Sequence, residues 1–110
     1  MTNIKNKVIG YVFNEDGMYD KKHYFEDTPS NIANFIVQNA NSVCVVTDTA
    51  DTLIVNSTVG GFVDRCPNQK YLQEELLPVL IPLQMGDVEP QEIEFIETEY
   101  CYEQVMQWAS

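Results

Sequence analysis

The sequence predicts an α+β fold, with a mostly antiparallel sheet of five to six strands and two helices packed on one face. Short β-rich segments follow one another with turn residues between them. Two other segments have apolar residues at helical spacing, and each has a proline near its start. The 110 residues are enough for a single globular domain, residues 1–110, that buries roughly two-thirds of its unfolded surface.

The first two strands are predicted near 7–13 and 18–26. The segment KVIGYVF is rich in β-branched and aromatic residues, which favour strands. NEDG at 14–17 is a turn sequence, because Gly17 can adopt a positive φ. The following segment MYDKKHYFED mixes charged and aromatic residues on both parities. We therefore expect a hairpin whose second strand is exposed.

The first helix is predicted over 29–39. Thr28 is a good N-cap, and Pro29 suits the first helical position, where its missing N–H is not needed. Its apolar residues recur at the spacing of one helix face and comprise Ile32, Phe35, Ile36 and Ala40.

Three strands of a meander are predicted next, near 43–47, 52–56 and 59–63. SVCVVT is apolar on both parities, as in a central strand that is buried on both faces. We interpret Gly60 and Gly61 as a bulge or a close backbone approach inside the third of these strands. The run VGGFVDRCPN contains neither G-x-x-x-x-G-K-S/T nor G-x-G-x-x-G, so no phosphate-binding loop is predicted there.

The second helix is predicted over 68–85. Pro67 suits its first position, which makes Cys66 or Asn68 the cap, and Gly86 suits the residue after its end. Its apolar face is formed by Leu72, Leu76, Leu80 and Leu83.

Two prolines complicate this second helix. Pro78 and Pro82 each remove a helical hydrogen bond and clash with the preceding turn, at a cost of about 3 kcal/mol. Either the helix is kinked, or it stops at Leu77 and residues 78–83 are extended. The kinked helix is favoured.

The segment EPQEIEFIETEYCYEQVMQWAS predicts a bulged strand near 92–102. Its apolar residues lie at odd-numbered positions up to Phe95 and at even-numbered positions from Ile96 onward. The glutamates occupy the alternate positions and shift at the same point, as they would if the strand contained one extra, bulged residue. One face would be apolar and the other a row of carboxylates. The predicted binding residues are those of this acidic face, Glu92, Glu94, Glu97, Glu99 and Glu103.

The ten residues expected in the core come from both helices and from the middle strands. They are Ile32, Phe35, Ile36, Val45, Val46, Ile54, Phe62, Leu72, Leu76 and Leu80.

The charge is large and unevenly placed. The net charge is −11, of which residues 1–70 carry −2 and residues 71–110 carry −9 without a single base. Direct binding to nucleic acid or to an anionic membrane is disfavoured, because both need clustered Lys and Arg. Such a surface is either only solubilising or complementary to a basic protein partner.

The cysteines favour a reducing cytoplasm. Cys44, Cys66 and Cys101 are odd in number and widely spaced, unlike a secreted disulfide framework. The amino-terminal segment has too short an apolar core for a secretory signal, and no apolar run approaches the ~20 residues of a membrane span.

No catalytic residue, cofactor or metal is predicted. A thiol enzyme needs a cysteine beside a base, and the candidate pair is Cys66 with the single histidine, His23. The same residues with Cys44 and Cys101 lack the close spacing of zinc ligands.

The expected function is therefore that of a non-enzymatic, small acidic interaction or regulatory module, which binds a protein partner through its acidic C-terminal face. One alternative is an inhibitor that mimics DNA. It would need a second row of carboxylates, for which Glu74, Glu75, Asp87 and Glu89 are the candidates. A small enzyme or a zinc or thiol site at Cys66 and His23 is the second alternative, and a homodimer through an edge strand is left open.

Overall fold

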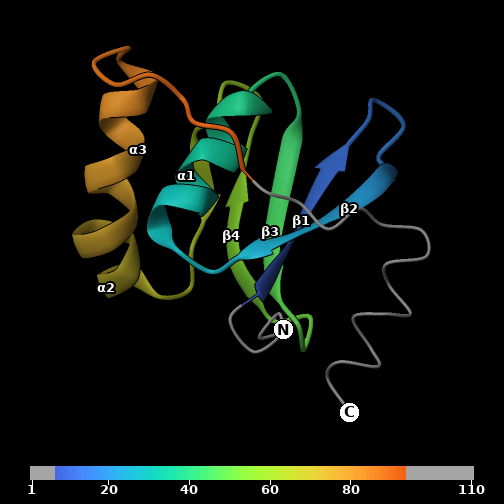
Figure 1. Ribbon diagram of the computed structural model, residues 1–110. Coiled ribbons are helices and arrows are strands. Elements are labelled where there is room, and N and C mark those ends of the chain that lie inside the picture. The colour runs from blue at the N-terminus through green and yellow to red at the C-terminus, as the bar shows by residue number, and fades with distance from the viewer. Residues whose placement is uncertain (1–6, 94–110) are drawn as a thin grey trace.

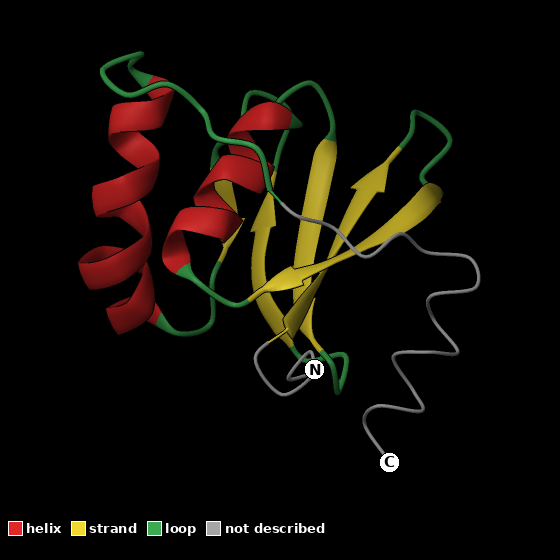
Figure 2. Cartoon of the chain, viewed as in Figure 1, coloured by secondary structure: helices red, strands yellow, loops and turns green. Residues whose placement is uncertain are grey.

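The computed structural model describes residues 7–93, which form a five-stranded antiparallel sheet with helices on one face (Figures 1 and 2). The strands lie in the order β2-β1-β3-β4-β5. Their bounds are β1 (Lys7–Phe13), β2 (Tyr19–Glu26), β3 (Val43–Asp48), β4 (Leu53–Ser57) and β5 (Val63–Arg65). The predicted α+β class is confirmed, and β3 is the central strand.

The helical layer consists of two helices that contact each other. The first is α1 (Pro29–Gln38), and the second is continuous over α2 (Gln69–Tyr71), η2 (Leu72–Leu76) and α3 (Leu77–Gln84). α1 begins as predicted, because Thr28 Oγ1 accepts a hydrogen bond from the Asn31 N–H at 3.1 Å. Within residues 7–93, no helix has the length and apolar character needed to cross a lipid bilayer.

The β1–β2 hairpin is confirmed with nearly the predicted bounds, but the prediction that its second strand is exposed is wrong, since Tyr24 and Phe25 of β2 are fully buried. Asn14 Oδ1 accepts hydrogen bonds from the backbone N–H groups of Asp16 and Met18, which closes the turn. Gly17 has a φ of +78°, as the turn sequence predicted.

The third strand of the meander is present as β5, but its predicted bounds of 59–63 are wrong, because residues 59–62 form the turn between β4 and β5 and the strand begins only at Val63. Gly60 and Gly61 have φ values of +100° and +80°, and the Thr58 N–H donates to the Phe62 carbonyl at 2.8 Å. The glycines therefore close a hairpin and do not form a bulge inside a strand. The predicted close approach is present, since the Gly60 N–H donates to the Ala40 carbonyl at 2.6 Å.

The main core lies between the sheet and the helices. Seven of the ten predicted core residues are buried there, and these are Ile32, Phe35, Ile36, Val46, Leu72, Leu76 and Leu80. Val45 and Ile54 are only half-buried. Phe62 is 67% exposed, because it ends the turn that replaces the predicted strand.

A second, smaller cluster lies on the opposite face of the sheet. It contains Ile9, Tyr11 and Tyr24, with Phe13 and Val45 packed against it. Strand register explains the division: β1 places its odd-numbered residues on this face, and places Val8 and Val12 in contact with the main core.

The chain after α3 returns along α1. Asn34 Oδ1 accepts a hydrogen bond from the Gln91 N–H at 2.7 Å, and Ile93 is buried in the main core. Glu92 and Ile93 are not in a strand, and the rest of the predicted strand 92–102 lies outside the described residues.

Candidate protein-binding surface

The second helix starts at Gln69, with Asn68 as its N-cap. Asn68 Oδ1 accepts a hydrogen bond from the Tyr71 N–H at 3.0 Å. Of the two predicted caps, Asn68 is therefore the one used. Pro67 lies before the cap, so its prediction as the first helical residue is wrong by two positions.

The helix continues through both prolines. A π turn precedes Pro78, in which the Leu77 N–H donates to the Leu72 carbonyl, five residues back. Pro78 then falls in the first turn of α3, where a missing N–H is tolerated. The favoured prediction of a helix through residues 78–83 is confirmed, and the extended alternative is wrong.

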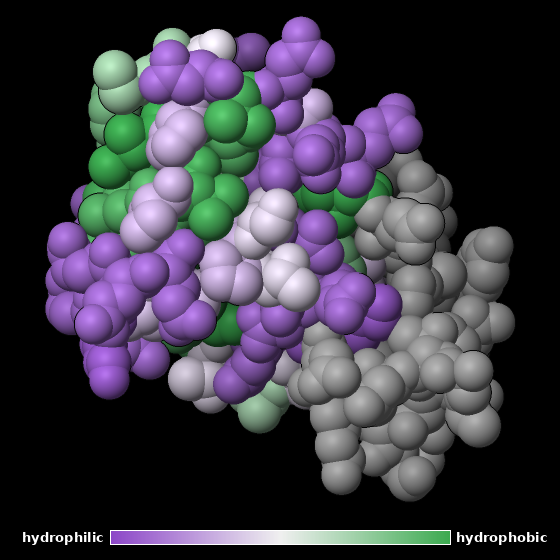
Figure 3. All heavy atoms as spheres, turned by 60° about the vertical axis from the view of Figure 1, so that its left-hand side comes forward, coloured by the Kyte–Doolittle hydropathy of each residue, from purple (hydrophilic) through white to green (hydrophobic). Residues whose placement is uncertain are grey.

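α3 is apolar on every side, yet it lies at the surface of the molecule. All eight residues from Leu76 to Leu83 are apolar or proline. Leu76, Leu80 and Leu83 are buried, but Ile81 is 45% exposed and Met85 is 71% exposed. Figure 3 shows hydrophobic side chains gathered over this helix. A helix that is apolar all round is normally buried on all sides, so the outer face of α3 is unusual.

A groove runs along each side of α3. The first, about 250 Å³ in volume, lies between α3, α1 and the returning chain, and its lining includes Asn34, Val79, Pro82, Leu83 and Val88. The second, about 280 Å³, lies between α3 and β5, and its lining includes Phe62, Cys66, Leu77, Leu80 and Gln84. Gln84 Nε2 donates to the Gly61 carbonyl at 2.6 Å and joins the end of α3 to the β4–β5 turn. The exposed Phe62 thus forms part of the surface beside α3.

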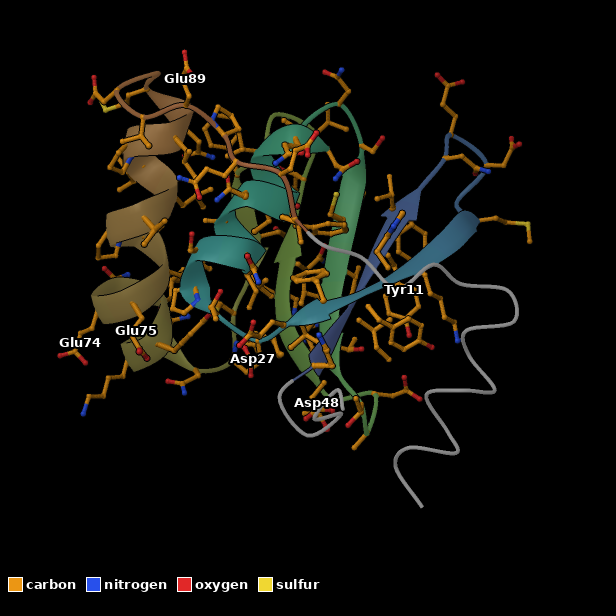
Figure 4. All side chains as sticks on the ribbon, in the orientation of Figure 1. Tyr11, Asp27, Asp48, Glu74, Glu75 and Glu89 are labelled. Atoms are coloured by element: carbon orange, nitrogen blue, oxygen red, sulfur yellow. The ribbon has the colours of Figure 1, made fainter. Side chains whose placement is uncertain are left out.

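Acidic side chains lie at both ends of α3 and not along it. Glu74 and Glu75 precede it, while Asp87 and Glu89 follow it. Figure 4 shows Glu74 and Glu75 at one end of the helix and Glu89 at the other. Residues 76–86 carry no charge over the ~12 Å length of α3. The four carboxylates considered as a second row for DNA mimicry are therefore divided by an apolar surface.

Negative charges around Asp27 affect one another near the start of this helix. The pKa of Asp27 is raised by partial burial, and further by the charges of Asp48 and Glu75. The pKa of the Tyr71 hydroxyl is raised mainly by burial, with Asp27 and Glu75 adding to it. A cation from a partner would relieve this repulsion.

The structure does not bring Cys66 and His23 together. His23 lies on β2 and Cys66 follows β5, which are opposite edges of the sheet. Five strands at a spacing of ~4.8 Å place these edges roughly 19 Å apart. The centroid of the His23 ring lies 6.0 Å from that of the Phe35 ring. Burial raises the pKa of the Cys66 thiol, which disfavours the reactive thiolate. The described residues do not form the predicted alternative thiol site.

The other candidate ligands do not complete a metal site within residues 7–93. Cys44 is buried, and its burial raises the pKa of its thiol to about 11. No group of three His, Cys, Asp or Glu side chains in the described part of the chain could hold a metal ion. Cys101 and four of the predicted binding residues, Glu94, Glu97, Glu99 and Glu103, lie outside the described residues.

Because burial raises the pKa of Cys66, we expect this thiol to react slowly at neutral pH. Alkylation by iodoacetamide, followed by peptide mapping, should label Cys66 more slowly in the folded protein than in urea, because the thiol is buried and less of it is thiolate. Labelling of the folded protein as fast as that of the unfolded chain would instead support a reactive thiol.

Sequence reasoning identified the buried face of α3 but missed its outer face. The segment LLPVLIPL contained the signal, since it is apolar at every helical position and not only on one stripe. Comparisons of this chain with protein families, with curated proteins and with solved structures found no match.

Proposed function

We propose that this chain is a non-enzymatic protein-interaction module that binds an amphipathic segment of a partner protein against α3. The observation that carries the proposal is the exposure of apolar side chains on α3, with a groove on each side of it. Exposed contiguous apolar surface rimmed by polar residues is typical of protein-binding sites. An amphipathic helix or extended segment can place its apolar side chains in such grooves.

The charges favour a partner with an apolar centre and basic ends. Glu74 and Glu75 lie at one end of α3, and Asp87 and Glu89 follow its other end in the sequence. A second copy packed on α3 would bring acidic ends together in either orientation, and like charges oppose such an interface. Lys or Arg residues at both ends of the partner segment would meet these carboxylates.

The predicted acidic C-terminal face belongs to the same proposal. Glu92 is exposed just beyond the groove that contains Val88 and Glu89. Its charge would extend the acidic end of the α3 surface. The regulatory role, the cytoplasmic location and the contribution of the remaining glutamates stay predictions.

Replacing Ile81 with lysine should abolish partner binding without unfolding the protein. Ile81 is half-exposed at the centre of the α3 surface, so the lysine can reach water, but it would place a charge where the partner's apolar side chains bind. We expect at least a tenfold loss of affinity, which corresponds to about 1.4 kcal/mol. The measurement is capture of proteins from a lysate of the source organism, followed by titration with the purified captured protein.

Met18→Lys is the matched control, because Met18 is 67% exposed on the distant β1–β2 turn and the substitution adds the same charge. The proposal requires a protein that the wild type and Met18→Lys capture and Ile81→Lys does not. A protein captured equally by all three would contradict it. Excess duplex DNA separates the alternatives, since displacement of the partner by DNA would instead support mimicry.

A further inference from the structure

An exposed aromatic ring stands at the end of the β4–β5 turn. Phe62 is 67% exposed, yet its carbonyl accepts hydrogen bonds from the backbone N–H of Thr58 at 2.8 Å and from Thr58 Oγ1 at 3.3 Å. The ring lies over Gly60, where an added Cβ atom would be 2.9 Å from Phe62 Cε2. Because the residue is already held in place, its ring can contact a partner with little further loss of conformational entropy.

The turn that carries this ring is attached to the helical layer at two points. The Gly60 N–H donates to the carbonyl of Ala40, which follows α1. Gln84 Nε2, at the end of α3, donates to the Gly61 carbonyl. The turn is therefore a preformed wall of the groove between α3 and β5.

This groove reaches the edge of the sheet. Phe62, Val63 and Asp64 all line it. The side chains of consecutive strand residues point to opposite faces, so a groove lined by all three must also reach their main chain. β5 is the edge strand at this end of the described sheet.

The main chain of Val63 is directed to that edge. The Phe62 carbonyl accepts its hydrogen bond from Thr58 across the hairpin, and Val63 is paired with Ser57. In an antiparallel pair, successive residues direct their N–H and C=O groups alternately toward and away from the neighbouring strand. The N–H and C=O of Val63 therefore point away from β4, where an added strand can bond to both.

The rest of the lining is apolar, with a single charge. Leu72, Leu77 and Leu80 of the second helix line the groove. Asp64 is the one charged residue among the described residues of the lining. A matching segment has apolar side chains at alternate positions of an extended chain, and one Lys or Arg that meets Asp64. A second copy of this chain fits less well, because the net charge of −11 on each copy opposes their association.

The groove between α3 and α1 offers no strand edge. Its lining comes from the two helices and from the chain that returns along α1, including Val88 and Gln91. Gln91 is fixed there by the hydrogen bond from its N–H to Asn34 Oδ1. This groove can take apolar side chains of a partner, but it has no strand with which the partner's main chain can pair.

We propose that the partner segment binds as an extended strand along β5, hydrogen-bonded to Val63 and packed against Phe62 and the leucines of the groove. This inference rests on the proposed function, since it takes the same α3 surface and specifies how the segment lies on it. The occupant is a lysine- or arginine-containing segment of another protein.

The shortness of β5 makes this pairing selective. β5 has only three residues, and two of them, Asp64 and Arg65, are exposed charged residues. Short and charged edge strands resist indiscriminate pairing with other chains. A segment must therefore match the groove as well as the strand edge, and backbone hydrogen bonds to Val63 alone do not suffice.

A synthetic peptide of this chemistry tests the strand pairing. The probe is a fluorescein-labelled peptide that alternates valine with threonine and carries one central lysine. Its control has the same side chains on methylated backbone nitrogens. Fluorescence polarisation with the full chain should show about tenfold weaker binding of the control, because methylation removes the N–H groups that pair with β5. Equal binding of the two peptides, or no binding of the probe at about 1 mM, would overturn the proposal.

Val63→Pro and Phe62→Ala test the same site in the protein. Proline is tolerated at the first residue of an edge strand, so Val63→Pro should fold although it lacks the outward N–H. Each variant should bind the probe about tenfold more weakly than the wild type does. Val63→Thr keeps the N–H and the β-branched shape, and Val59→Ala truncates a 63% exposed side chain on the same turn. Both controls should bind like the wild type.

The variants also separate this inference from the proposed function. Circular dichroism verifies folding, and the methylated peptide gives a readout that needs no variant. Loss of binding in Val63→Pro and Phe62→Ala, but not in their controls, supports the proposal. A captured protein that Ile81→Lys loses and that Val63→Pro and Phe62→Ala retain would overturn this inference and leave the proposed function standing. Self-association of the chain that Val63→Pro abolishes would overturn it in favour of a second copy.

Discussion

Replacing Gly10 with alanine is expected to destabilise the protein by about 3 kcal/mol, the upper part of the range for overpacking a core. A Cβ atom at this position would lie 2.6 Å from Phe35 Cζ and 2.9 Å from Phe25 Cε1. Both rings are fully buried, with their centroids 5.2 Å apart, so neither can move without disturbing the core. Urea denaturation of the wild type and Gly10→Ala measures the difference.

A double-mutant cycle with Phe35→Leu shows whether the predicted clash is the cause. The smaller leucine makes room for the new methyl group, so Gly10→Ala should cost less in the Phe35→Leu background than in the wild type. Strictly additive effects would show that the alanine acts elsewhere, for example on the unfolded state.

Replacing Asn34 with alanine should release the chain that returns along α1 and cost about 2 kcal/mol. Asn34 is only 4% exposed, and its Oδ1 is the acceptor for the Gln91 N–H. Its Nδ2 also donates to the Ser30 carbonyl at 2.8 Å. The substitution removes two partly buried hydrogen bonds at once, and their loss is more costly than the loss of one solvent-exposed hydrogen bond. Urea denaturation measures the loss, and hydrogen exchange at Gln91 should show the local release.

Asn31→Ala provides the comparison within the same helix. Asn31 Nδ2 also donates to a backbone carbonyl, that of Glu26, but this hydrogen bond is exposed. We expect its loss to cost about 0.5 kcal/mol and to leave exchange at Gln91 unchanged. Equal destabilisation by the two alanines would mean that helix propensity, and not the contact with Gln91, determines the result.

The Asn34 contact also shapes the candidate binding surface. Asn34 and Gln91 both line the groove between α1 and α3. Gln38 Nε2 donates to the Gln91 carbonyl as a second attachment. Release of this chain should therefore weaken partner binding as well as stability, which links the fold to the proposed function.

The element bounds that sequence reasoning predicted well are those determined by neighbouring residues. Thr28 caps α1 through a hydrogen bond to a residue three positions ahead, and Asn14 closes the first turn within four residues. Such contacts need no information from the rest of the chain. The hairpin, α1 and the start of the meander were predictable for this reason.

The error at Gly60 and Gly61 has the opposite cause. Glycine is compatible with a bulge, a close approach or a turn, so local chemistry leaves several conformations open. The contact with the Ala40 carbonyl, 20 residues away in the sequence, accompanies the choice of a turn. The exposure of Phe62 then followed from that turn, although its apolar side chain predicted burial.

By itself, the sequence determined the α+β class, the order of the described elements, the buried face of each helix and the concentration of acid after residue 70. Only the tertiary structure decided that α3 keeps an exposed apolar face, that acids lie at both of its ends, and that Cys66 and His23 are on opposite edges of the sheet. The physical reason is range: periodicity and capping depend on residues within one or two turns. Exposure and proximity depend on which distant segments pack together.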